Sequence, residues 1–113
     1  MRRMRWVAPI VSGALALSLA GAGVATARPE AAATKRVAIK DNLFSPKTVT
    51  INKGSTVKWT NQGNRTHTVT FNTGSYDKLV SPGATVKRTF NKSGTFRYHC
   101  RIHDGMTGKV VVN

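Results

Sequence analysis

From about residue 37 to the C-terminus, apolar and polar residues alternate with a period of two, in short runs separated by glycine, proline, asparagine and serine. A period of two places alternate side chains on opposite faces of a β-strand, and no long window shows the period of a helix. The runs that we predict as strands cover residues 37–40, 48–51, 56–60, 67–71, 86–90, 96–100 and 109–112.

Short alternating strands with frequent turns are typical of an all-β sandwich or barrel. We therefore predict an all-β fold, a small Greek-key β-sandwich. One position breaks the pattern, since Arg88 lies between Val86 and Phe90 on the apolar face of its run. The core is small, and a bound metal would add to its stability.

The N-terminal segment, residues 1–27, has a different pattern. Arg2, Arg3 and Arg5 precede an uncharged stretch, residues 6–25, which ends in an Ala-Thr-Ala site of the small-x-small kind. This order of basic, apolar and small residues predicts a secretory signal peptide. The alternative is an uncleaved membrane anchor, but glycine, proline and serine dilute the stretch. We expect an exported protein, periplasmic or extracellular at the cell envelope, without stable membrane insertion after cleavage.

The remainder of the chain is enough for one domain. Residues 28–36 are rich in alanine and are expected to form a flexible leader, so the domain is expected to cover residues 37–113. Lys and Arg number 18 against 4 Asp and Glu, a net charge of +14. Export and the lack of interleaved aromatic residues argue against nucleic-acid binding. The charge favours solubility and steering toward acidic partners or an anionic envelope surface, and we expect a monomer.

The candidate chemistry is concentrated near the C-terminus, where Cys100, His103 and Met106 form a C-x2-H-x2-M motif. Cys100 is the only cysteine of the chain, so an intramolecular disulfide is excluded. A thiolate, an imidazole and a thioether on one short loop form a soft ligand set, which favours copper. Taken singly, the cysteine and the methionine could equally be apolar core residues.

The strand pattern supplies a second imidazole. His67 shares a strand face with Val69 and Phe71, and Cys100 shares one with Tyr98, so both point toward the core near strand ends. Two nitrogens, one thiolate and a distant thioether make the trigonal arrangement of a blue-copper centre. Of the remaining candidates, His99 is expected on the surface and Trp59 in the core.

Longer segments resemble the cupredoxins, the family of plastocyanin, pseudoazurin and amicyanin. The resemblance covers the whole domain and includes the F-x-P opening at Phe44, the K-G-x-x-V-x-W-x-N segment from Lys53, the P-G pair at Pro82 and the strand that leads to Cys100. The ligand loop has the shortest spacing of the family. The resemblance implies one type 1 copper per chain, held by His67, Cys100, His103 and Met106.

Two positions depart from the family pattern. Ile102 stands where better-known members have proline, and Thr68 stands where they often have asparagine. We expect an altered reduction potential and a retained site. Asn61 is either a hydrogen-bonding link between the two ligand loops or a loop-initiating residue.

These features predict a one-electron carrier that works with a redox protein partner, with the edge of His103 beside Ile102 as the port for electrons. A module that stores or delivers copper would use the same ligands and is the alternative. An enzyme is not expected, because three histidines cannot also build a catalytic copper cluster. A zinc site is disfavoured by the thioether.

Overall fold

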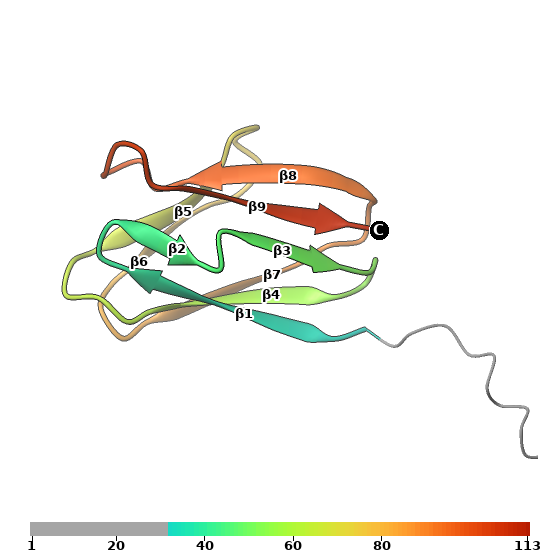
Figure 1. The fold of residues 1–113 in the computed structure, drawn as a ribbon, viewed down its shortest axis with the longest axis horizontal. Helices are drawn as coiled ribbons and strands as arrows, with labels where there is room; N and C mark the ends of the chain where they lie inside the picture. Colours follow the sequence, from blue (N-terminus) through green and yellow to red (C-terminus); the bar gives the residue numbers. More distant parts are fainter. Residues whose placement is uncertain (1–31) are drawn as a thin grey trace, which may run out of the picture. The chain divides into compact units, whose positions relative to one another are not determined.

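The computed structural model describes residues 32–113, so the expected signal peptide and the start of the expected leader lie outside the described part. This part consists of strands joined by turns and loops (Figure 1). No helix between residues 32 and 113 is long and apolar enough to cross a membrane. The strands are β1 (Thr34–Lys40), β2 (Leu43–Ser45), β3 (Thr48–Ile51), β4 (Thr56–Asn61), β5 (His67–Phe71), β6 (Asp77–Val80), β7 (Thr85–Thr89), β8 (Gly94–His99) and β9 (Thr107–Val112).

The strands form two sheets that share one core. The first has four strands in the order β2-β1-β4-β7, and the second has five in the order β3-β9-β8-β5-β6. Most neighbours are antiparallel, but β1 runs parallel to β4, and β3 runs parallel to β9. Figure 1 shows the two sheets as layers of a sandwich. The predicted class of fold, a β-sandwich, is therefore confirmed.

The main differences from the strand prediction are two missed strands and one earlier start. Cys100, predicted as the end of a strand over residues 96–100, lies just after β8. The alternation does not predict β2, which has only three residues, or β6, where three exposed residues precede the buried Val80 and no alternation exists. Strand β1 begins at Thr34, which pairs with Thr56 of β4, so the last residues of the expected leader belong to a sheet. Pairing with a long neighbouring strand outweighs the polar composition of this segment.

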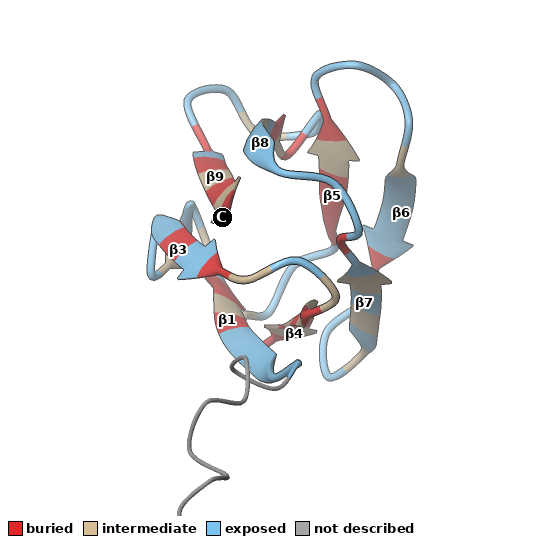
Figure 2. Cartoon of the chain, turned by 90° about the vertical axis from the view of Figure 1, so that its right-hand side faces the viewer, coloured by how far each residue is buried: buried red, intermediate tan, exposed pale blue. Residues whose placement is uncertain are grey.

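Buried and exposed residues alternate along the strands, as the bands on β3 in Figure 2 illustrate. Trp59 of β4 is fully buried, and its ring packs edge-to-face against Phe71 and Tyr98, with centroids 6.0 and 5.4 Å away. Aromatic pairs in this geometry add stability beyond the area that they bury. The prediction that Trp59 is a core residue is confirmed.

The irregular position in β7 has a physical explanation. The guanidinium carbon of Arg88 lies 4.5 Å from the ring centroid of Phe71 and 4.8 Å from that of Phe90. A guanidinium stacks on aromatic faces while its methylene groups cover apolar surface. Partial burial lowers the pKa of Arg88. Arg88 therefore takes a place beside the core that alternation assigns to an apolar residue.

Candidate metal centre

Three side chains of types that can hold a metal ion meet at one end of the sandwich. His67 begins β5, Cys100 directly follows β8, and His103 lies in the loop before β9. The Sγ atom of Cys100 is 3.8 Å from Nδ1 of His67 and 3.5 Å from Nδ1 of His103. One ligand atom from each residue lies within 4.8 Å of the other two. The sequence prediction that these three residues converge is thus confirmed.

Strand geometry accounts for the positions of His67 and Cys100. His67 has no exposed surface and lies on the same strand face as Val69 and Phe71, which are also buried. Cys100 is 4% exposed and follows the buried Tyr98 by two positions. Both donors therefore point inward from neighbouring strands of one sheet, β5 and β8.

The loop from Cys100 to Met106 is closed by its own backbone. The N–H of Cys100 donates to the carbonyl of Met106 at 2.9 Å, and the N–H of Met106 donates to the carbonyl of His103 at 3.4 Å. Gly105 has a φ of 78°, a left-handed conformation that favours glycine. The side chain of Met106 is 1% exposed and belongs to the apolar core at this end of the sandwich.

The environment of Cys100 favours its thiolate. Burial by itself raises the pKa of the thiol, but hydrogen bonds to Sγ outweigh burial and lower the pKa to about 6. The N–H of Thr68 is one donor, 3.4 Å from Sγ. The thiolate is the negatively charged form of cysteine, and it is the form that binds metal ions.

Thr68 links the two segments that carry the donors. It is fully buried, and its Oγ1 accepts the N–H of Arg101 at 2.9 Å. Asn61 has another role: its Nδ2 donates to the carbonyls of Arg65 and Val80, both at 2.8 Å, and its Oδ1 accepts from a loop amide. Asn61 is therefore a loop-organising residue, and Thr68 makes the link between the two segments that carry the donors.

Asp41 is a neighbour of the site that the sequence analysis does not identify. It lies in the turn between β1 and β2, and its Oδ1 is 2.9 Å from Nε2 of His67. The hydrogen bond from His67 is the main cause that lowers the pKa of Asp41. Asp41 in its turn and His67 at the start of β5 are 26 positions apart in the sequence, so no local motif joins them.

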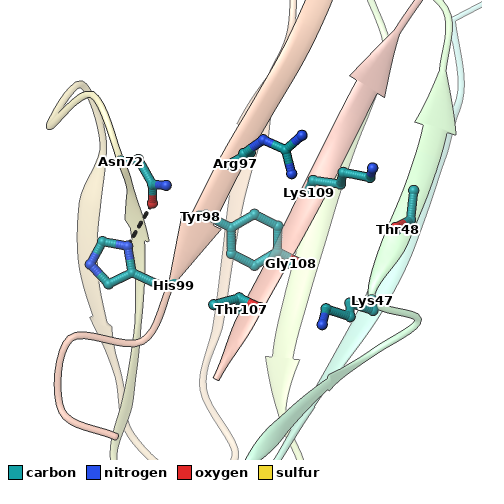
Figure 3. Close-up of a pocket in the computed structure, with 9 residues that line it drawn as sticks. All are labelled: Lys47, Thr48, Asn72, Arg97, Tyr98, His99, Thr107, Gly108 and Lys109. Carbon is teal, nitrogen blue, oxygen red and sulfur yellow. Dashed lines mark hydrogen bonds between the residues drawn. The ribbon is translucent and has the colours of Figure 1, made fainter. Parts of the chain in front are cut away.

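A groove in the described part lies away from these donors, on the outer face of the five-stranded sheet. Its volume is about 520 Å³, and Figure 3 shows Arg97, Lys109 and Lys47 around it. His99 lies at its margin, where Nδ1 is 2.7 Å from Oδ1 of Asn72. His99 therefore faces the side opposite Cys100, as its position in the strand predicts.

Comparisons with known proteins identify the family. A family model described as "Cupredoxin-like domain" matches residues 10–112, so the chain belongs to the cupredoxin-like family. Amicyanin-alpha of Methylorubrum extorquens is 30% identical over 118 residues, covering 99% of both chains. A chloroplastic plastocyanin of Tetradesmus obliquus is 33% identical over 84 residues, and the match spans 62% of this chain but only 58% of that protein.

A solved structure extends the comparison to the metal. An amicyanin variant in its reduced Cu(I) form is 28% identical, with a TM-score of 0.64, and the match covers 79% of this chain and 89% of that chain. Copper is therefore the cofactor indicated by the family, and the thiolate and two imidazoles of this chain fit it chemically.

Proposed function

We propose that this chain is an exported blue-copper electron-transfer protein, in which His67, Cys100, His103 and Met106 hold one copper ion. The observation that carries the proposal is the meeting of one thiolate and two imidazoles within 4.8 Å at the end of a cupredoxin-like sandwich. When bound, copper supplies a one-electron couple between Cu(II) and Cu(I).

The protein's contribution is a fixed set of donors. His67 begins β5, and Cys100 follows β8, which pairs with β5. The hydrogen bond from the N–H of Arg101 to the buried Thr68 joins the segments that carry these two donors. Because rigid donors rearrange little between oxidation states, electron transfer meets a low reorganisation cost. Met106, buried in the same loop, would supply a weak thioether donor that tunes the potential.

The difference in exposure between the two histidines indicates where electrons enter and leave the site. His103 is partly exposed, whereas His67 is fully buried, and Ile102 beside His103 is 48% exposed. An apolar residue beside an accessible imidazole edge allows a partner to approach without removing water from a charge. We infer that the partner is a redox protein that docks at this edge.

The charge of the chain favours an acidic partner. Arg97 and Lys109 are direct cross-strand neighbours, and on the other sheet Arg36, Lys58 and Lys87 occupy one cross-strand row. No ion pair between these residues and a carboxylate occurs in residues 32–113. Such fields raise association rates with proteins of opposite charge and are screened by salt. Export follows from the predicted signal peptide, residues 1–27.

A single reconstitution experiment tests the proposal. The chain from residue 28 is purified, one equivalent of Cu(II) is added and the visible absorption spectrum is recorded, with Cys100→Ala as the control. The proposal predicts an intense thiolate-to-copper band that is absent from the control. A protein without this band that binds only Cu(I) would favour the alternative, a copper-trafficking module with the same ligands.

A further inference from the structure

The two ring nitrogens of His67 face different groups. Nδ1 lies toward Cys100, 3.8 Å from its Sγ, and Nε2 lies 2.9 Å from Oδ1 of Asp41. An ionised carboxylate can only accept hydrogen bonds, so the proton of a neutral His67 is held on Nε2. Nδ1 is then left with a free lone pair on the side of the thiolate.

The contact is part of a larger arrangement around Asp41. Its carboxylate also accepts the N–H of Asn64, at 3.0 Å from Oδ2, and the N–H of Arg65, at 3.2 Å from Oδ1. These donors belong to the loop that leads from β4 to His67. One carboxylate therefore fixes both the imidazole of His67 and the backbone just before it.

The space for this carboxylate depends on Gly63. A Cβ atom at that position would overlap Oδ1 of Asp41 and would lie only 2.8 Å from its Cγ. Because the carboxylate occupies the place of that side chain, only glycine lets the loop close over Asp41. The fit indicates that the turn and the loop are complementary in shape as well as in hydrogen bonding.

The backbone holds the turn against the loop independently of the carboxylate. The N–H of Gln62 donates to the carbonyl of Ile39 at 2.8 Å, just before the turn. Asn42 completes the turn with a φ of 83°, a left-handed conformation that asparagine tolerates better than most residues. Asp41 is thus carried on a defined turn, 31% exposed at its side chain, beside a fully buried histidine.

Asp77, another carboxylate of the described part, has other surroundings. Asp77 accepts from Arg101 and from Thr70, and it contacts none of the three donors. Asp41 is one of only four acidic residues in the chain, and it bonds a histidine although 18 Lys and Arg residues are present. This placement indicates that Asp41 acts on His67.

We propose that Asp41 is a positioning residue for the copper site, which holds His67 with Nδ1 presented to the metal and places a negative charge beside the ligand. The proposal rests on the proposed function of the site. Carboxylates that accept from a metal-bound histidine fix its tautomer and raise its basicity, and their loss costs roughly 10- to 100-fold in metal affinity. A negative charge near the site also favours Cu(II) over Cu(I), which lowers the reduction potential.

The test compares Asp41→Asn, Asp41→Ala and the control Asp77→Asn, which removes an equal charge that bonds Arg101 and Thr70 but neither histidine of the site. Copper affinity is measured by chelator competition, and the reduction potential is measured by titration. We expect Asp41→Ala to lose roughly 10- to 100-fold in Cu(II) affinity. We expect Asp41→Asn, whose amide can still accept from the loop, to raise the potential more than Asp77→Asn does. Equal shifts in the Asp41→Asn and Asp77→Asn proteins would overturn the proposal.

A second measurement does not depend on copper. Nitrogen-15 NMR of the metal-free protein reports which ring nitrogen of His67 carries the proton. We expect Nε2–H in the native protein and a loss of this preference in Asp41→Ala and in Gly63→Ala, where the added Cβ displaces the carboxylate. The same tautomer in all three proteins would contradict the proposal. A native protein without the copper-thiolate band would instead contradict the proposed function, and the NMR result would still decide the role of Asp41.

Discussion

The two histidines of the site occupy contrasting regions. His67 starts a strand, is fully buried and has its second ring nitrogen bonded to Asp41. His103 lies in a loop, is partly exposed, and contacts the thiol of Cys100 and the ring of His67, whose centroid is 4.7 Å away. The difference indicates a division of roles, because one imidazole is anchored in the sandwich and the other closes the site from the solvent side.

Removal of each imidazole gives the largest expected difference between the two regions. His67→Gly and His103→Gly should both lose more copper affinity than the roughly 10- to 100-fold that loss of a hydrogen-bonded neighbour costs. Added imidazole should restore the absorption band in His103→Gly, because that position is open to solvent. Added imidazole should not restore the band in His67→Gly, because that position is enclosed by the core.

Absorption titrations with imidazole check this prediction. The Cys100→Ala protein is the control, since no added imidazole can replace its thiolate. Equal rescue of the two glycine variants would contradict the division of roles.

Loss of the hydrogen bond between Thr68 and Arg101, which links the two regions, should have a smaller effect than loss of either imidazole. In Thr68→Val the N–H of Arg101 loses an acceptor that is fully buried. Arg101 itself is exposed, so the loss is that of an ordinary hydrogen bond, about 0.5–1.5 kcal/mol, and urea unfolding of the metal-free protein should show a decrease of this size. Amide exchange should also accelerate in the His103 loop more than at His67. Thr50→Val, at an exposed strand position, is the matched control and should be near neutral.

The exposed side of the site allows a test of function without a change in stability. Ile102 is 48% exposed, so Ile102→Ser should leave the unfolding free energy within about 0.5 kcal/mol of the native value. The rate of electron exchange between protein molecules should fall, because an apolar docking position is lost. Leu79→Ser is the control, at an exposed leucine outside the ligand loop, which is 59% exposed. Equal rates in the two variants would contradict docking at His103.

Reversal of surface charge should have the smallest effect of these changes, a slower association with an acidic partner, and high salt should remove this effect. The double charge reversal Arg97→Glu and Lys109→Glu should slow association with an acidic redox protein at low ionic strength, by stopped-flow kinetics. At high salt the rates of variant and native protein should converge. If the reversal of Lys53 and Lys92, both in turns outside the groove, slows association equally, net charge rather than this face controls association.

Much of this molecule follows from its pattern of residues. The period of two correctly predicts the sandwich and the inward direction of His67 and Cys100, because strand faces are determined by parity. His103 lies in a loop, and its place beside Cys100 follows from the short spacing of the C-x2-H-x2-M motif. Whether these residues and Met106 bind copper in solution remains a prediction.

Other features depend on contacts between distant segments. Arg88 lies beside the core because four aromatic rings surround it, and no local pattern reports this. Asp41 belongs to a turn, and its contact with His67 exists only because β1 and β4 pair side by side. The role of Thr68 likewise follows from the register of β5 and β8. Hydrogen bonds of this kind carry no periodic signal in the sequence.

Voltammetry of the copper-loaded protein tests the central claim most directly. The account predicts a reversible one-electron wave, with the thiolate-to-copper band lost on reduction and fully recovered on reoxidation, because the donors retain the metal in both states. Release of copper to a chelator on reduction, with no recovery of the band, would contradict an electron carrier and would support copper delivery.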